Sequence, residues 1–225
     1  HNQLSAIFNY AVRYYGLSSN PARVAVNMGK ETNGEMQFWT KEEYMTFSKA
    51  MMKKDGIFQA FEMLYWCGLR LGEMLALTPS DFDFNKKTVR INKSYQCIKG
   101  EDVITDPKTI KSNRVVQMPD FLADEMEDYL SRQYELKPND RIFTVTKSGM
   151  HHEMDRGCKE TGVKRIRIHD LRHSHVSLLI EMGFSAVDIA NRVGHESVKI
   201  TYRYAHMFPS KDKAIADKLT DFRGG

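Results

Sequence analysis

Cysteine is scarce in this sequence. The 225 residues include three cysteines, Cys67, Cys97 and Cys158, which lie far apart and form no CxxC pair. An odd number of widely spaced cysteines argues against a disulfide framework and against a cysteine-rich zinc site. This usage suits a reducing compartment, and we expect a cytoplasmic protein.

Long apolar runs are also missing. No stretch approaches the roughly 20 apolar residues that a membrane span needs, and the first 25 residues mix polar and apolar types, unlike a signal peptide. There is no Walker loop, no internal repeat and no low-complexity segment. A membrane is therefore not an expected partner. Because the chain begins at His1, inside a helical pattern, we interpret it as a fragment.

The composition is that of an ordinary globular protein. Hydrophobic residues make up 41% and charged residues 28%, and the length predicts one or two domains with a sizeable core. The net charge of +4, with an isoelectric point near 8.8, permits a nucleic-acid partner without proving one.

The chain divides into two parts. Residues 1–25 contain apolar residues at helical spacing from Leu4 to Tyr15, and we interpret them as the end of another domain. Residues 26–37 are polar with two glycines and predict a linker. Residues 38–225 then form the main domain.

The main domain is predicted to be mostly helical, with one small antiparallel sheet. Thr40 and Glu43 form a capping box for a helix to about Met52, and residues 57–68 are apolar nearly all round, as in a buried helix. Short β-rich runs between residues 81 and 118 predict three strands. Further helical patterns cover residues 71–77, 120–135, 170–182, 185–193 and 211–219. This is an α+β fold.

Residues 168–175 read IHDLRHSH, a dense histidine cluster that could hold a metal ion. His169 and His173 have a two-ligand helical spacing, and His195 or His206 could supply a third ligand. The glutamate of an HExxH motif is absent, however, and a guanidinium beside the site would repel a dication. We therefore expect no metal, and we interpret His173 and His175 as structural.

A phosphate suits the same cluster better. His169 and Arg172 lie on one face at the start of a predicted helix, whose positive end and free N–H groups favour an anion. A guanidinium binds phosphate oxygens through two hydrogen bonds, and an imidazole can add a third. An HxxR pattern alone is common, so the hypothesis depends on the rest of the chain.

Three further segments bear on it. His195 precedes Tyr204 by nine residues, and on one straight helix this spacing would place the two side chains on opposite faces. If both belong to one site, the helix must be interrupted between them, and Gly194 with Ser197 offers a place for that. In GLRLGE, residues 68–73, the arginine lies between two apolar helices and needs a partner such as Glu73. Two lysines in DPKTIKSNR lie beside a predicted hairpin turn, where lysines are usually solvated.

Together these motifs resemble the catalytic domain of the tyrosine recombinase (phage-type integrase) family, from residue 38 to about 222. The strongest part of the resemblance is an ordered set of three motifs. HDLRH comes first, GH follows 23 residues beyond the arginine, and TYRY has its second tyrosine nine residues after that histidine. GLRLGE is similar to the family's first arginine box, and PKTIKS to its β-hairpin lysine segment. The opening helix and linker resemble the end of the family's core-binding domain.

The resemblance implies a role for each matched residue. Tyr204 is the expected nucleophile, which attacks a backbone phosphate of double-stranded DNA to give a 3′-phosphotyrosyl link. Arg70 and Arg172 are expected to hold the non-bridging oxygens, and His169 and His195 to assist by hydrogen bonds and proton transfer. Two guanidiniums can stabilise the transferring phosphoryl group without a metal or another cofactor.

Two of these assignments have competitors. Lys108, rather than Lys111, is expected to donate a proton to the departing 5′-oxygen, because PKT fits the family's lysine position better. Tyr202 lies two residues before Tyr204, and we interpret it as a packing residue.

The resemblance also implies partners. DNA is expected to lie across a basic face that also collects Lys164, Arg165 and Arg167. The expected assembly is a homotetramer on DNA in a bacterial cell, with residues 211–219 docked on a neighbouring protomer. It would integrate and excise a mobile element with the help of accessory DNA-bending or excision factors. A nicking-closing enzyme of the type IB topoisomerase kind and a catalytically inactive DNA-binding relative are the alternatives.

Overall fold

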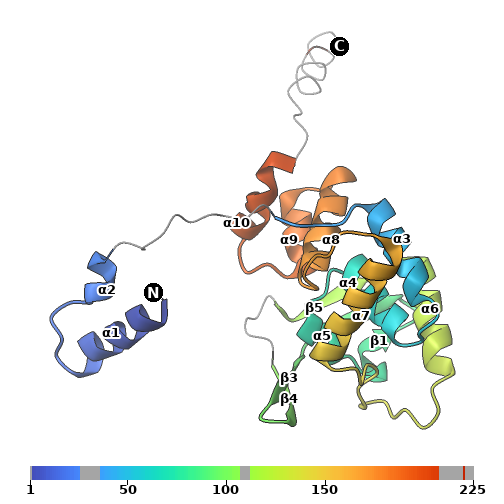
Figure 1. Cartoon of the computed structure of the whole chain (residues 1–225), viewed down its shortest axis with the longest axis horizontal. Helices are drawn as coiled ribbons and strands as arrows, with labels where there is room; N and C mark the ends of the chain where they lie inside the picture. Colours follow the sequence, from blue (N-terminus) through green and yellow to red (C-terminus); the bar gives the residue numbers. More distant parts are fainter. Residues whose placement is uncertain (1, 26–35, 107–111, 208–219, 221–225) are drawn as a thin grey trace. The chain divides into compact units, whose positions relative to one another are not determined.

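The computed structural model describes residues 2–25, 36–106, 112–207 and 220 (Figure 1). It divides into two compact units, residues 1–36 and 37–225. In the first unit, α1 (Asn2–Tyr14) is followed by α2 (Pro21–Val24). Asn20 caps α2 by accepting from Ala22 N, and its amide donates to Ser5 O and to Asn9 Oδ1, which fixes α2 against α1. Over the described ranges, no helix is long and apolar enough to cross a membrane.

The second unit is built around α4 (Ile57–Trp66), which packs against α3 (Lys41–Met51), α5 (Leu71–Leu75), α6 (Asp120–Ser131) and α8 (Asp170–Glu181). The side chains of Phe61, Met63 and Leu64 are fully buried, so the predicted core helix is confirmed. α3 begins at the predicted capping box, where Thr40 N donates to Glu43 Oε2 at 2.8 Å and Glu43 N donates to Thr40 Oγ1 at 3.3 Å.

The strands form two small antiparallel sheets, and the prediction of a single three-stranded sheet was wrong in this respect. One sheet has the order β1 (Phe82–Asp83), β2 (Thr88–Ile91), β5 (Arg114–Gln117), and the other is a hairpin of β3 (Ser94–Ile98) and β4 (Glu101–Thr105). The run TVRINKSYQCI breaks after Ile91 because Lys93 leaves the strand to bind buried Asp81, with Nζ 2.6 Å from Oδ1. The resulting hairpin projects from the domain body (Figure 1).

The sequence interpretation missed α7 (Lys147–Thr161), which packs against α3. Thr146 caps it by accepting from Gly149 N at 2.9 Å. Met150, Met154 and Cys158, spaced four residues apart, form its buried stripe, within a segment that is otherwise polar. The expected fold class, a mostly helical α+β domain, is confirmed, with two small antiparallel sheets in place of the one expected.

The C-terminal part consists of α8, α9 (Ala186–Val193), α10 (Val198–Thr201) and the 3-10 helix η3 (Tyr202–Met207), which lie together in Figure 1. α9 ends at Gly194, whose φ of 68° is left-handed, and Ser197 caps α10 by accepting from Lys199 N. The break required between His195 and Tyr204 is therefore present. The helix expected over residues 211–219 lies outside the described residues.

Candidate active site

The structure brings five of the six predicted site residues into one region of the second unit. Arg70 precedes α5, and His169 and Arg172 lie at the start of α8. The other two are His195, just beyond α9, and Tyr204 in η3. The sixth, Lys108, and its competitor Lys111 lie outside the described residues.

Arg172 is a buried cation with an unmet hydrogen-bonding need. Its side chain is only 3% exposed, and Nη1 donates to Gly68 O at 2.9 Å. Nη2 is buried and has no hydrogen-bond partner in the part of the chain that the structure describes. Burial, reinforced by the Arg70 guanidinium, lowers the pKa of Arg172 to about 9, so it stays charged at neutral pH. A buried guanidinium nitrogen without an acceptor is costly, and an anion bound here would supply the missing acceptor.

Arg70 and Arg114 add to the positive charge and share one carboxylate. Arg70 Nη1 lies 2.6 Å from Glu73 Oε1, which confirms the predicted pairing, and Arg114 Nη2 lies 2.9 Å from Glu73 Oε2. Burial opposes the ionisation of Glu73, but the hydrogen bond and charge of Arg114, with Arg70, outweigh it and lower its pKa. With Arg172 there are three guanidiniums and one carboxylate, so the cluster keeps an excess of positive charge.

Sequence reasoning missed Arg114. It lies on β5, where NRVVQM indicated only a strand, and its Nε also donates to Arg192 O at 3.0 Å. A charged residue at the start of a strand gives little local signal, since its importance depends on what the fold places opposite it.

His195 is buried and uncharged at neutral pH. Burial, together with the charges of Arg172 and Arg70, lowers its pKa to about 3. Its Nδ1 lies 2.8 Å from Thr201 Oγ1, and Arg70 Nη2 donates to the neighbouring Gly194 O at 3.3 Å. A neutral imidazole can donate one hydrogen bond, here to an anion held by the guanidiniums.

His169 has an exposed surface at the start of α8, and partial desolvation by the surrounding protein, with the charge of Arg172, lowers its pKa. The expectation of free N–H groups at this helix start was wrong. The N–H groups of Asp170, Leu171 and Arg172 donate to the carbonyls of Arg167, Ile168 and His169, because the chain enters α8 through a tight turn. An anion here would depend on side chains rather than on the helix backbone.

Tyr204 is 2% exposed, and burial raises the pKa of its phenol to about 12, although Arg172 and Arg203 oppose the shift. The hydroxyl forms a short hydrogen bond with Nδ1 of His173. His173, interpreted from the sequence as structural, therefore lies in the site. Tyr202 is 57% exposed, which contradicts the packing role expected for it.

His175, the third histidine of the cluster, is bonded to Arg192 rather than to Tyr204. It is 2% exposed, and its Nε2 accepts from Arg192 Nε at 3.1 Å. This placement agrees with the structural role expected for it. Among the described residues, no group of three His, Cys, Asp or Glu side chains is placed to hold a metal ion.

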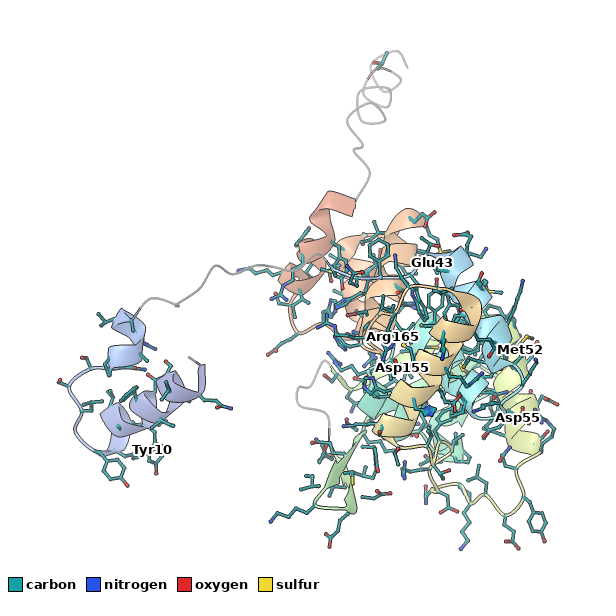
Figure 2. All side chains as sticks on the ribbon, in the orientation of Figure 1. Tyr10, Glu43, Met52, Asp55, Asp155 and Arg165 are labelled. Atoms are coloured by element: carbon teal, nitrogen blue, oxygen red, sulfur yellow. The ribbon has the colours of Figure 1, made fainter. Side chains whose placement is uncertain are left out.

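The other basic residues expected on the DNA-binding face are each paired with a carboxylate. Arg165 Nε contacts Asp155 (Figure 2), Lys164 Nζ lies 3.3 Å from Glu43 Oε1, and Arg167 Nη2 lies 2.8 Å from Asp170 Oδ1. Their charges are therefore partly neutralised, and Arg172 lies beneath the surface rather than on it.

Comparison with known proteins places the chain in a family. The model of the phage integrase family matches residues 37–211. The chain is 35% identical to the ICEBs1 integrase of Bacillus subtilis (strain 168), over 97% of this chain and 63% of that protein. It is 26% identical to a tyrosine recombinase XerC-like protein of Caldanaerobacter subterraneus, over 98% of this chain and 64% of that protein. The chain thus spans less than two thirds of these relatives.

The fold is also that of solved recombinase structures. The Tn1549 transposon integrase in complex with circular intermediate DNA matches with a TM-score of 0.71 at 17% identity, over 96% of this chain and 76% of that chain. The catalytic domain of bacteriophage HP1 integrase matches with a TM-score of 0.58 at 18% identity, over 82% of this chain and 95% of that chain. The resemblance inferred from the motifs is confirmed: the chain belongs to the phage integrase family, the tyrosine recombinases.

Proposed function

We propose that this chain is the catalytic part of a site-specific DNA recombinase, which cuts and rejoins DNA strands through a 3′-phosphotyrosine intermediate. One observation carries the proposal: Nη2 of buried Arg172, which has no partner among the described residues, lies in a cluster with excess positive charge, next to a buried tyrosine hydroxyl. This is an anion site beside a nucleophile, which is what transfer of a phosphoryl group to tyrosine requires.

A DNA phosphodiester fits this site by charge and by geometry. It carries one negative charge and two non-bridging oxygens, which Arg172 and Arg70 bind. His195 adds a donor when its Nδ1 accepts from the Thr201 hydroxyl, because Nε2 then carries the proton. His169 completes the set from the exposed side.

Tyr204 attacks the phosphorus, and Lys108 protonates the departing 5′-oxygen, with Lys111 as the competing donor. The protein–DNA bond conserves the energy of the phosphodiester, so neither ATP nor another cofactor is required. The free tyrosine is a poor nucleophile, and the burial that raises its pKa makes it poorer until a phosphate and its cations lie beside it.

Double-stranded DNA is the proposed partner. The relatives are named integrases of phages and of other elements, and one structural neighbour was solved with circular intermediate DNA. The proposed reaction is integration and excision of a mobile element by a homotetramer on DNA, with residues 211–219 docked between protomers and with accessory DNA-bending or excision factors. Residues 1–25 then form the end of a core-binding domain, joined by residues 26–37.

The test is covalent trapping. Short duplexes from the ends of the DNA element that encodes the protein, each with a nick that lets the cut fragment diffuse away, are incubated with the protein and excess chelator. We expect adducts that survive a denaturing gel, that disappear in Tyr204→Phe and that persist in Tyr202→Phe. Chelator-sensitive phosphate release without adducts would contradict the proposal.

A further inference from the structure

The resemblance implies that His169 and His195 assist in proton transfer, but it does not say which group takes the proton of Tyr204. Among the described side chains, the Tyr204 hydroxyl hydrogen-bonds with His173, and no such bond joins it to His169 or His195. The two rings lie with centroids 5.7 Å apart at an interplanar angle of 51°. A nucleophile and a base within hydrogen-bond reach are the arrangement that activates a hydroxyl.

A carboxylate lies near the other ring nitrogen of His173. Nε2 of His173 lies 3.8 Å from Oδ1 of Asp170, a carboxylate that is 1% exposed and is held by Arg167. A negative charge on that side favours the tautomer with the proton on Nε2, which leaves the lone pair of Nδ1 facing the Tyr204 hydroxyl. The same carboxylate stabilises the imidazolium that forms when Nδ1 takes a proton.

From this geometry we propose that His173 accepts the proton of Tyr204 during strand cleavage, with Asp170 setting its tautomer. The proposal rests on the proposed function and adds a residue to it. The lone pair of the Tyr204 oxygen forms the bond to phosphorus, the bond from phosphorus to the 5′-oxygen breaks, the phenolic proton moves to Nδ1 of His173, and Lys108 protonates the 5′-oxygen. In rejoining, the 5′-hydroxyl returns its proton to Lys108, and His173 returns its proton to Tyr204.

The charges around His173 favour this role once DNA is bound. Burial, with the neighbouring His169, lowers the pKa of His173 to about 4, so the ring is neutral and can accept a proton. The titratable and charged groups that face it are His169, Asp170, Arg167 and Arg172 around α8, His195 beyond α9, and Tyr204 in η3. A phosphodiester beside Arg172 offsets the positive charge in this set, which raises the pKa of His173 and makes it a stronger base.

The role can be separated from simple positioning by two substitutions. In His173→Asn, the side-chain oxygen takes the place of Nδ1 and still accepts a hydrogen bond from Tyr204, but it cannot hold a proton. In His173→Ala, both functions are lost, and added imidazole can enter the space. His152→Ala, which removes an exposed histidine of α7, is the matched control.

The rate of adduct formation is measured with the nicked duplexes from about pH 6 to about pH 9. Both His173 variants should be slower on the order of 100-fold at neutral pH, with rates that climb as the solution itself deprotonates the tyrosine, and imidazole should partly restore His173→Ala. A His173→Asn variant as fast as the unmodified protein overturns the proton-transfer role. Unmodified protein that forms no adduct with any duplex overturns the proposed function instead, and this role with it.

A measurement without DNA tests the tautomer separately. The nitrogen chemical shifts of ¹⁵N-labelled histidine, assigned by comparison with His173→Asn, should show His173 protonated at Nε2 and bare at Nδ1. Protonation at Nδ1 would mean that His173 donates to Tyr204, which overturns the proposal whether or not the protein cleaves DNA.

Discussion

Replacing Glu73 by glutamine should destabilise the protein strongly, because it removes the carboxylate that the guanidiniums of Arg70 and Arg114 share. Glu73 is 5% exposed and accepts from Arg70 Nη1 at 2.6 Å and from Arg114 Nη2 at 2.9 Å. Removing one partner of a buried ion pair costs about 3–5 kcal/mol. Glutamine keeps an acceptor oxygen and Arg70 is partly exposed, so the lower figure, about 3 kcal/mol, applies.

That loss corresponds to a fall in the unfolding midpoint of about 6–12 °C for a domain of this size. The pH dependence of the stability follows from the lowered pKa of Glu73. Its ionised side chain stabilises the folded protein above the ordinary pKa of 4.5, and this stabilisation is lost as the pH falls through the lower pKa of the folded state. The difference between the two proteins should therefore be full at neutral pH and should close in acid.

The assay is urea unfolding at neutral and acidic pH, repeated with inorganic phosphate. Phosphate should stabilise Glu73→Gln more than the unmodified protein, because the variant's guanidiniums have lost their carboxylate. Glu160→Gln is the matched control, since it breaks a more exposed pair with Arg156 and should cost at most about 1 kcal/mol. A Glu73→Gln protein as stable as this control would refute the reasoning.

Three further predictions concern single side chains. Burial raises the pKa of Glu125 to about 7, so the unmodified protein should lose about 1–2 kcal/mol, after allowance for partial exposure, as the pH rises from 4.5 through 7. Urea unfolding should show that Glu125→Gln removes this slope and that Glu127→Gln keeps it; an unchanged slope in Glu125→Gln would contradict the assignment. A methyl group at Gly157 would lie 2.5 Å from Phe47 Cε2, so Gly157→Ala should lower thermal stability by about 1–3 kcal/mol, and no loss would mean that α3 and α7 can separate freely. Arg172→Lys keeps the positive charge but loses the planar guanidinium, which can bind a phosphate through two hydrogen bonds. Covalent trapping should therefore be at least about tenfold slower, and an equal rate would exclude a bidentate contact between Arg172 and the phosphate.

Much of this fold was predictable because its signals are local. The Thr40 capping box, the apolar helix after residue 57 and the break at Gly194 each depend on a few neighbouring residues. The pairing of Arg70 with Glu73 is of the same kind, since both residues belong to one short segment.

Other features depend on contacts between distant segments. Lys93 leaves the β-rich run because buried Asp81, twelve positions earlier, binds it. α7 went unrecognised because its polar composition hides a narrow buried stripe that packs against α3. In the same way, His173 and His175 look alike in the sequence, and only the position of η3 shows which one meets Tyr204.

The most direct test of a Tyr204 nucleophile is to locate the covalent bond. Trypsin cuts after Arg203, so it separates Tyr202, in the peptide 200–203, from Tyr204, in the peptide 204–211. After nuclease digestion of the trapped adduct, mass spectrometry should find the remaining nucleotide, joined through its 3′-phosphate, on peptide 204–211. Its presence on peptide 200–203, or on neither, would contradict the assignment of Tyr204.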